Sequence, residues 1–218
     1  MMSKERVGVV RFPGTNCDRD VFEAVEACGH KAQWLWHQDR FTVSDFDRIV
    51  IPGGFSYGDY LRCGALAAKA PVMTSLHEAA NQGLPILGIC NGFQILCESG
   101  LLPGALIRNQ SLRFVDRWVN LNLKNANRHW AGSTAKVRLP VAHGEGRFYI
   151  DDDGMKRLQD QNQIWWTYSE NPNGSLADIA GVTSEKGNVA ALMPHPERAM
   201  VEWMGGRDGL AFFQGGLA

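Results

Sequence analysis

The sequence predicts an α/β fold, in which an open, mostly parallel sheet carries helices on both faces. In the first half of the 218-residue chain, short apolar runs typical of strands alternate with segments of helical periodicity. The runs are continuously apolar, as expected of parallel strands that are covered on both faces. In the second half, further β segments lie between polar and glycine-rich turns. These observations predict a parallel sheet with extra β segments added by the second half.

The first expected element is a strand over Val7–Phe12, which ends at Pro13-Gly14. Asn16 is a good N-cap residue, and the apolar positions that follow it have helical spacing. Strands are then expected over Ala32–Trp36, Arg48–Ile51 and Pro85–Ile89, and helices over Asp59–Lys69 and Met73–Gln82. This order of elements predicts right-handed crossovers between neighbouring parallel strands.

After Gly104 the pattern becomes richer in β segments. Strands are expected over Leu112–Leu123, Thr134–Leu139, Arg147–Ile150, Trp165–Tyr168 and Val189–Met193, and a last helical turn over Gly209–Gln214. No internal repeat or long linker accompanies the change in composition near residue 105. We therefore expect a single domain over residues 1–218.

The composition argues against several classes of protein. Hydrophobic residues make up 44% of the chain, and 22 basic residues nearly balance 23 acidic ones, so no net charge favours nucleic acid or anionic lipid. Apolar stretches such as Pro85–Cys90 are far shorter than the ~18 residues of a membrane span. Residues 1–15 lack the apolar core and cleavage site of a signal peptide. We expect a cytoplasmic protein with no nucleic-acid or membrane partner.

The cysteines and histidines indicate neither a disulfide framework nor a metal site. The five cysteines form no Cys-x-x-Cys pair, and the six histidines show no spacing typical of zinc ligands. Four of the cysteines are expected to be buried small apolar residues: Cys17, Cys28, Cys63 and Cys97.

Cys90 differs from the others in its local sequence. Gly88-Ile89-Cys90-Asn91-Gly92 follows an expected strand and precedes a helical pattern, which is the context of a nucleophile elbow. Glycines two residues before and after the cysteine permit a sharp turn. The helix N-terminus favours the thiolate, and the N–H of Asn91 would face a developing oxyanion. Cys90 is therefore the candidate nucleophile.

A partner for such a thiol is found in Met193-Pro194-His195-Pro196-Glu197. If the two prolines hold this segment extended, His195 and Glu197 leave the chain on the same side, where the carboxylate can orient the imidazole. The segment also follows an expected buried strand, at the edge where open α/β sheets place their sites. His195 and Glu197 are the candidate base and orienting group.

The glycine-rich segment from Pro52 to Asp59 follows a third expected strand. It could be an ordinary turn, or its backbone N–H near Gly54 could serve as a second oxyanion donor beside Asn91. It does not match a phosphate-binding loop, and no Gly-x-Gly-x-x-Gly motif occurs elsewhere. Any nucleotide chemistry must therefore take place outside this chain.

A cysteine elbow, a Pro-Gly-Gly turn and a late His-x-Glu on an α/β sheet resemble the class I, or triad, glutamine amidotransferases, which have a flavodoxin-like fold. A longer set of motifs resembles the glutaminase subunits of small-form phosphoribosylformylglycinamidine synthases of purine biosynthesis. The motifs are residues 12–18 (FPGTNCD), 52–64 (PGGFSYGDYLRCG), 88–96 (GICNGFQIL), 143–148 (HGEGRF) and 193–199 (MPHPERA).

The resemblance implies that Cys90 attacks the carboxamide of L-glutamine while Gly54 and Asn91 stabilise the oxyanion. His195, oriented by Glu197, would protonate the departing ammonia and then activate water to hydrolyse the glutamyl thioester. It also implies a set of substrate-binding residues, which are Gly53, Gln94, Ser111, Arg113, Phe114 and His143. For Gln94 the alternative is a solvent-facing helix residue, and for Arg113 and Arg147 it is surface charge.

The resemblance further implies partners. No cofactor or metal is expected in this chain. ATP and Mg²⁺ are expected on a large synthetase subunit, which would receive ammonia through an internal channel with the help of a small bridging subunit. The product would be formylglycinamidine ribonucleotide, made from formylglycinamide ribonucleotide.

Two alternatives remain at this point. One is another cysteine hydrolase, such as a peptidase or a deglycase-like protein. In those the histidine usually follows the cysteine closely, whereas here 195 − 90 = 105 residues separate them. The other is a catalytically silent binding module, which would have no reason to keep Cys90, His195 and Glu197 together.

Overall fold

The computed structural model describes residues 4–130 and 135–214, whose strands form a nine-stranded sheet and a two-stranded sheet. Five parallel strands form one half of the large sheet, in the order β2 (Lys31–Trp36), β1 (Arg6–Arg11), β3 (Arg48–Ile51), β4 (Ile86–Ile89) and β11 (Val189–Leu192). The predicted α/β fold on a parallel sheet is confirmed.

The second half of the chain extends the same sheet. Beyond β11 the sheet continues with antiparallel pairings through β10 (Ile179–Thr183), β9 (Ile164–Tyr168), β6 (Val115–Leu123) and β7 (Lys136–His143). The small sheet pairs β5 (Ala105–Ile107) with β8 (Arg147–Tyr149). The extra β segments of the second half thus share a sheet with the strands of the first.

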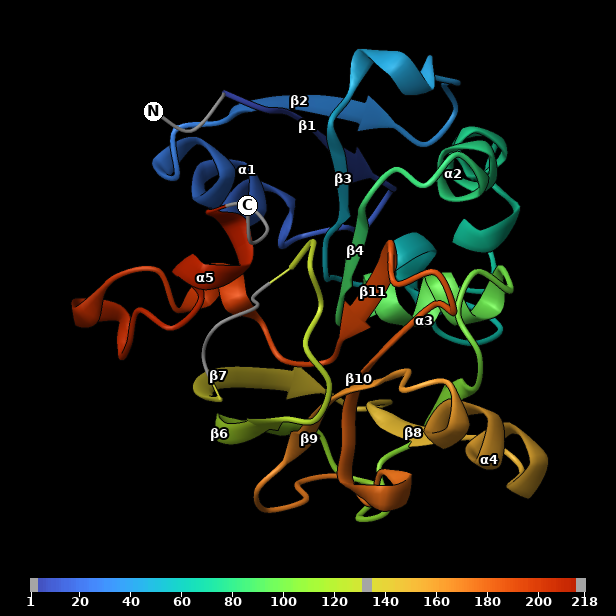
Figure 1. The fold of residues 1–218 in the computed structure, drawn as a ribbon, viewed down its shortest axis with the longest axis vertical. Coiled ribbons are helices and arrows are strands. Elements are labelled where there is room, and N and C mark those ends of the chain that lie inside the picture. The colour runs from blue at the N-terminus through green and yellow to red at the C-terminus, as the bar shows by residue number, and fades with distance from the viewer. Residues whose placement is uncertain (1–3, 131–134, 215–218) are drawn as a thin grey trace.

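Helices cover both faces of the parallel strands, as predicted. Figure 1 shows α1 (Asp18–Ala27) and α5 (Leu210–Phe213) on one side and α2 (Val72–Asn81) and α3 (Asn91–Glu98) on the other. A further helix, α4 (Asp152–Asp160), lies beside the β-rich half. Because α3 packs against β3, β4 and β11, its N-terminus is held at the carboxyl ends of the central strands.

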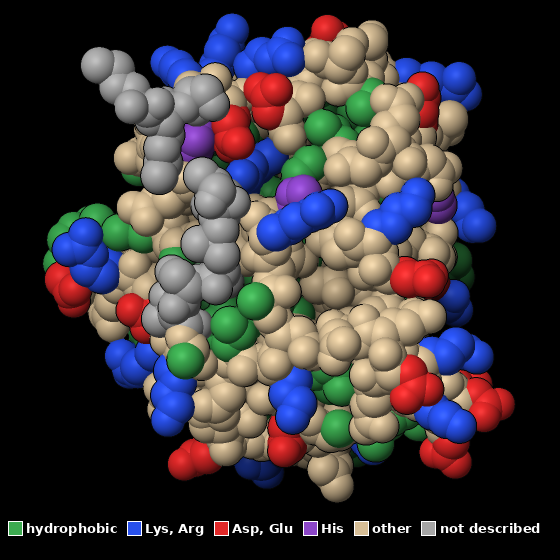
Figure 2. All heavy atoms as spheres, in the orientation of Figure 1, with side chains coloured by type: hydrophobic (Ala, Val, Ile, Leu, Met, Phe, Trp, Pro, Cys, Tyr) green, Lys and Arg blue, Asp and Glu red, His purple; other side chains and the backbone are tan. Residues whose placement is uncertain are grey.

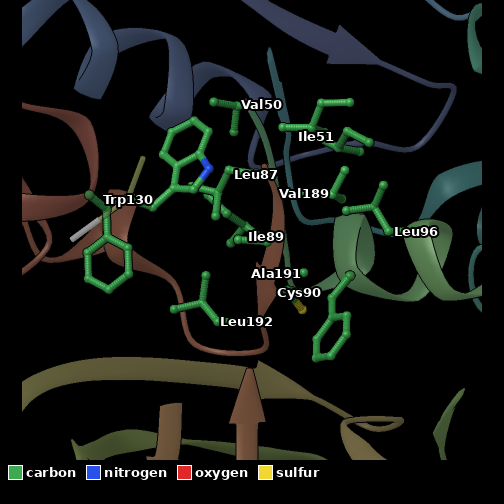
Figure 3. Packing of buried hydrophobic residues seen from close by; sticks show 14 of the residues in the cluster. Val50, Ile51, Leu87, Ile89, Cys90, Leu96, Trp130, Val189, Ala191 and Leu192 are labelled. Atoms are coloured by element: carbon green, nitrogen blue, oxygen red, sulfur yellow. The ribbon is translucent and has the colours of Figure 1, made fainter. Parts of the chain in front are cut away.

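The core lies around the three central strands, in which every residue of β3, β4 and β11 is buried. Figure 3 shows Val50, Ile51, Leu87 and Ile89 in this core, with Cys90 at the end of β4. Burying an aliphatic side chain of this size stabilises the fold by about 1.5–3 kcal/mol. The residue that follows β4, Cys90, therefore extends directly from the fully buried centre of the sheet.

Two local predictions are wrong. The helix expected over Asp59–Lys69 is absent, and the segment instead contains short 3₁₀ turns at Ser56–Asp59 and Ala67–Lys69. Within this segment Asp59, Leu61 and Gly64 adopt left-handed conformations, with φ values of 55°, 70° and 81°, which interrupt a right-handed helix. Asn16 is not an N-cap, because α1 begins one residue later and Cys17 occupies that position.

Other expected boundaries shift, and some elements were not predicted. The strand expected from Leu112 begins only at Val115, as β6, because Leu112 has a φ of 58°, which an extended strand excludes. Of the strand expected from Thr134, the first residue lies outside the described residues, and β7 begins at Lys136. The helix α4 has Asp151 as its N-cap, and the Asp151 carboxylate accepts a hydrogen bond from the N–H of Gly154 at 2.7 Å. This cap is a recognisable signal that the apolar pattern alone does not reveal. The strands β5 and β10 were also not predicted.

The face shown in Figure 2 carries basic and acidic side chains side by side, in keeping with the formal net charge of −1. Within residues 4–130 and 135–214, no helix is both long and apolar enough to cross a lipid bilayer.

Candidate active site

Cys90 lies at a sharp turn between β4 and α3. It is the N-cap residue of α3 and has φ 51° and ψ −104°, a strained conformation for a residue with a side chain. A Cβ atom at Gly88 would lie 2.5 Å from Leu96 Cδ1, and one at Gly92 would overlap the carbonyl oxygen of Ile51. The predicted strand–turn–helix geometry is thus present, and both glycines are required by close packing.

The Cys90 thiol is placed in a polar environment at the start of a helix. Its side chain is buried, and its Sγ lies 3.8 Å from the carbonyl oxygen of Ala142. The N–H of Asn91 belongs to the first turn of α3 and therefore has no acceptor within the helix. A free N–H and the positive end of the helix dipole both favour negative charge next to Cys90.

His195 and Glu197 form a buried pair. Their side chains are joined by a 2.6 Å hydrogen bond between Nδ1 and Oε1, and each residue is only 2% exposed. The chain is extended at His195 and then enters a 3₁₀ turn at Pro196–Arg198. The expected fully extended segment is therefore wrong in detail, but the turn still directs both side chains to the same place.

The charge of His195 is set by its neighbours. Burial disfavours the imidazolium, but the Glu197 carboxylate and the Cys90 sulfur outweigh burial and raise the pKa of His195 well above its ordinary value. Its Nε2 is buried and has no hydrogen-bond partner among the described residues. Because Nδ1 is engaged by Glu197, Nε2 is the nitrogen available for proton transfer.

Gly53, at the end of β3, shows how closely the predicted catalytic residues approach one another. A Cβ atom at Gly53 would lie 2.8 Å from His195 Cε1 and 3.3 Å from both Cys90 Cβ and Cys17 Sγ. Any larger residue would therefore separate the imidazole from the cysteine. The structure brings Cys90, His195 and Glu197 together, as the motif spacing predicted.

Two cavities open at Cys90. The larger has a volume of about 300 Å³ and the smaller about 150 Å³, and Gly54, Phe55, Phe114 and Ala142 border both. Gly54 has φ 138°, and a Cβ atom there would lie 2.6 Å from the backbone nitrogen of Asn16. The backbone of Gly54 thus borders the space in front of Cys90, where an N–H group is needed to donate a hydrogen bond to the oxyanion.

Most, but not all, of the residues expected to bind substrate line the larger cavity. Gln94, Arg113, Phe114 and His143 line the larger cavity, whereas Ser111 is exposed and does not. Gln94 is buried, and its Nε2 donates to the carbonyl oxygen of Glu145 at 2.7 Å. Gln94 therefore does not face solvent.

His143 is held in its neutral form. Its Nδ1 lies 3.2 Å from Asn109 Oδ1, and its Nε2 lies 3.4 Å from Asn173 Nδ2. Burial and the nearby charge of His195 lower the pKa of His143 to about 4. Arg147, two residues beyond the cavity-lining Glu145, donates to the carbonyl oxygen of Gly174 at 3.0 Å. These contacts fix the loops behind the cavity.

Cys17 and Arg198 also border the smaller cavity and were not predicted to do so. Arg198 Nη2 lies 3.1 Å from Cys17 Sγ, and Arg198 Nε lies 3.5 Å from Asp20. Cys17 follows the turn after β1, at the carboxyl edge of the sheet, which is the signal that could have found it. Donor atoms of Cys17, His195 and Glu197 lie within 4.8 Å of one another, but the Arg198 guanidinium beside them opposes a bound cation.

Comparison with known proteins places this geometry in a family. The sequence profile of the CobB/CobQ-like glutamine amidotransferase domain matches residues 4–207. A chain of the PurLQS structure from Thermotoga maritima is 45% identical, with a TM-score of 0.88 and a match that covers 97% of each chain. A glutamine amidotransferase from the same organism is 17% identical, and the match covers 90% of this chain and 78% of that one with a TM-score of 0.63. At this low identity the likeness shows a shared fold alone.

Proposed function

The chain belongs to the CobB/CobQ-like glutamine amidotransferase family, and on this premise we propose that it is the glutaminase component of a phosphoribosylformylglycinamidine synthase. The observation that carries the proposal is the elbow at Cys90, which faces His195 and Glu197 and opens on a cavity of about 300 Å³. The 45% identity to a PurLQS chain over 97% of the sequence supports the choice of synthase. Membership of this family favours an amidotransferase over the other cysteine hydrolases.

The first half of the reaction forms a thioester. Cys90 Sγ, as the thiolate, attacks the side-chain carboxamide carbon of glutamine, and the N–H groups of Gly54 and Asn91 stabilise the resulting oxyanion. His195 Nε2 donates its proton to the amide nitrogen, the C–N bond breaks and ammonia leaves. The raised pKa of His195 keeps that proton available while Cys90 carries negative charge.

The second half regenerates the enzyme. His195, now neutral, accepts a proton from a water molecule, whose oxygen attacks the thioester carbon. The C–S bond then breaks, glutamate leaves and the Cys90 thiolate is restored opposite the imidazolium. Glu197 stabilises the imidazolium at both stages through its 2.6 Å hydrogen bond.

The released ammonia needs an acceptor that this chain does not provide. No phosphate-binding loop motif occurs in the sequence. We therefore assign the ATP- and Mg²⁺-dependent amination of formylglycinamide ribonucleotide to a large synthetase partner, which acts with a small bridging subunit and receives the ammonia through a channel. Exposed apolar side chains at the cavity, Phe55, Leu112 and Phe114, are suited to contact such a partner.

Replacing the nucleophile tests this function. In the complex with its synthetase, Cys90→Ala should abolish glutamine-dependent formation of formylglycinamidine ribonucleotide, while ammonia-dependent formation should persist. A diazoketone analogue of glutamine should label the wild-type chain at Cys90. Cys28→Ala, at the end of α1 and away from both cavities, serves as the matched control and should behave as wild type. Full glutamine-dependent synthesis by Cys90→Ala, together with no labelling of the wild type, would contradict the proposal.

A further inference from the structure

The turn that carries Gly54, residues 53–58, is called the oxyanion turn below, and most of its backbone N–H groups are used within the protein. The N–H groups of residues 55–58 each donate a hydrogen bond, in chain order to Gly14 O, Asn91 Oδ1, Pro13 O and Phe55 O. The N–H of Gly54 has no acceptor among the described residues, and Gly54 borders both cavities at Cys90. The oxyanion turn therefore leaves one N–H free beside the place where the oxyanion forms.

Tyr57 holds the oxyanion turn in an unfavourable conformation. Its φ of 54° and ψ of 27° lie in the left-handed region, which a residue with a side chain rarely adopts. Its N–H donates to the carbonyl oxygen of Pro13 at 2.6 Å. The next residue along, Gly14, packs so closely against the turn that a Cβ atom there would overlap the carbonyl oxygen of Phe55. Such a strained turn persists only where its surroundings fix it.

The side chain of Tyr57 supplies one such fixed contact. Its hydroxyl oxygen lies 2.6 Å from His37 Nδ1, and the two rings meet edge to face with centroids 5.4 Å apart. Burial lowers the pKa of His37, against the opposing charge of Asp39, and raises the pKa of Tyr57. Both groups are therefore neutral near pH 7, and the contact is a hydrogen bond between a phenol and an imidazole.

His37 is in turn fixed to the scaffold of the sheet. It is buried, its N–H donates to the carbonyl oxygen of Arg11 at 3.0 Å, and its carbonyl oxygen accepts from the N–H of Val72 at 3.1 Å. Arg11 ends β1 and Val72 begins α2. Neither Tyr57 nor His37 lines either cavity at Cys90. The pair thus connects the oxyanion turn to the scaffold from outside the space that the substrate occupies.

We propose that Tyr57 and His37 are positioning residues, whose hydrogen bond holds the oxyanion turn in the strained form that leaves the Gly54 N–H free for the oxyanion. This inference rests on the proposed function, since it concerns how one donor to the oxyanion is held in place. The oxyanion exists only after Cys90 attacks and is absent from the bound substrate. Loss of the hydrogen bond should therefore lower kcat and leave KM nearly unchanged.

The test measures glutamate release by the complete complex with its synthetase. Tyr57→Phe removes only the hydroxyl group and should lower kcat for glutamine about 10-fold, below the 10²–10³-fold loss typical when an oxyanion donor is removed altogether. KM should stay within about two-fold of wild type. His37→Leu should cause the same loss, and the double variant should lose no more than either single variant, because both side chains act through one hydrogen bond.

Three controls separate positioning from folding. His37→Asn keeps an acceptor close to the position of Nδ1 and should retain most of the wild-type kcat. Tyr149→Phe makes the same chemical change at an exposed position on β8 outside both cavities and should behave as wild type. Iodoacetamide alkylates a thiolate without forming an oxyanion, so it should modify Cys90 at the wild-type rate in Tyr57→Phe.

The outcomes distinguish this inference from the proposed function. If wild type hydrolyses glutamine and both Tyr57→Phe and His37→Leu keep the wild-type kcat, the positioning role is overturned and the glutaminase stands. A parallel fall in kcat and in the alkylation rate of Cys90 also overturns it, because the elbow itself would then be disturbed. If wild type does not hydrolyse glutamine and the diazoketone analogue fails to label Cys90, the proposed function is overturned as well.

Discussion

Burial disfavours the charged form of His195, yet its pKa lies well above the ordinary value, and Glu197 is the largest of the influences that raise it. Glu197 is joined to it by a 2.6 Å hydrogen bond, and both side chains are almost fully buried. The Glu197 carboxylate is the main influence that raises the pKa of His195 against the effect of burial. The reactivity of the site therefore depends on a residue that need not touch the substrate.

Glu197→Gln should lower kcat/KM for glutamine by on the order of 10²–10⁴, because the imidazolium loses its counter-charge and its orientation. The raised pKa keeps His195 protonated as pH rises, so loss of Glu197 should move the alkaline fall of kcat/KM to lower pH. The measurement is the pH profile of kcat/KM in the complex. Glu202→Gln, an exposed residue nearby in sequence, is the control. An unshifted alkaline limb would argue against this role of Glu197.

At the residue scale, the sequence predicts those parts of the site whose residues lie within a few positions of one another along the chain. Cys90 and the His195–Glu197 pair are identified by local spacing and by the strands before them. Cys17 and Asp59 border the cavities only because separate segments of the chain meet there. Single-sequence patterns do not encode such long-range approaches, so these two residues were not predicted as site residues.

At the scale of elements, the site depends on how tightly α3 packs against the sheet. Gly92 lies in the first turn of α3, where any Cβ atom would overlap the carbonyl oxygen of Ile51 at the end of β3. The same close approach places the helix N-terminus, with Cys90, beside Gly53 and His195. Both the close packing of α3 on β3 and the placement of Cys90 therefore require a residue without a side chain at position 92.

Gly92→Ala should lower the free energy of unfolding by about 1–3 kcal/mol, the typical cost of overpacking a tight core. Chemical denaturation followed by circular dichroism would measure it. Gly206→Ala is the matched control, because a Cβ atom there would meet Trp118 no closer than 3.5 Å, and we expect a change within about 0.5 kcal/mol. Equal stability of Gly92→Ala and wild type would contradict the close approach of α3 to β3.

Elements were predicted where pattern and packing agree. The central strands β3, β4 and β11 are buried on both faces, and their continuous apolar runs predict this burial. The segment Asp59–Lys69 carries helical periodicity, but Asp59, Leu61 and Gly64 take left-handed conformations there, which a right-handed helix excludes. The helix α4 lies at the surface with Leu158 as one of its few buried residues, so its apolar signal is weak.

At the scale of the whole molecule, the two halves of the chain build one site. The parallel half supplies Cys90, Gly53 and His195, and the antiparallel extension brings β7 across the edge of the sheet. The carbonyl oxygen of Pro140 on β7 accepts a hydrogen bond from the backbone N–H of His195 at 2.8 Å. Ala142, also on β7, lies next to the Cys90 thiol. The extension thus fixes His195 and closes one side of the catalytic space.

The opposite side of that space is open, which predicts how activity depends on a partner. Phe114 and Leu112 are 55% and 74% exposed beside the larger cavity, so water reaches the site and the loop that carries them lacks packing on its outer side. A partner that covers these side chains would exclude water and order the loop. We expect the isolated chain to hydrolyse glutamine slowly, and kcat/KM to rise by about 10-fold or more when the synthetase and its nucleotide substrates are added. Steady-state release of glutamate measures both states, with Cys90→Ala as the blank. Rapid hydrolysis by the free chain that is unchanged by the synthetase would show that the site is complete without its partner.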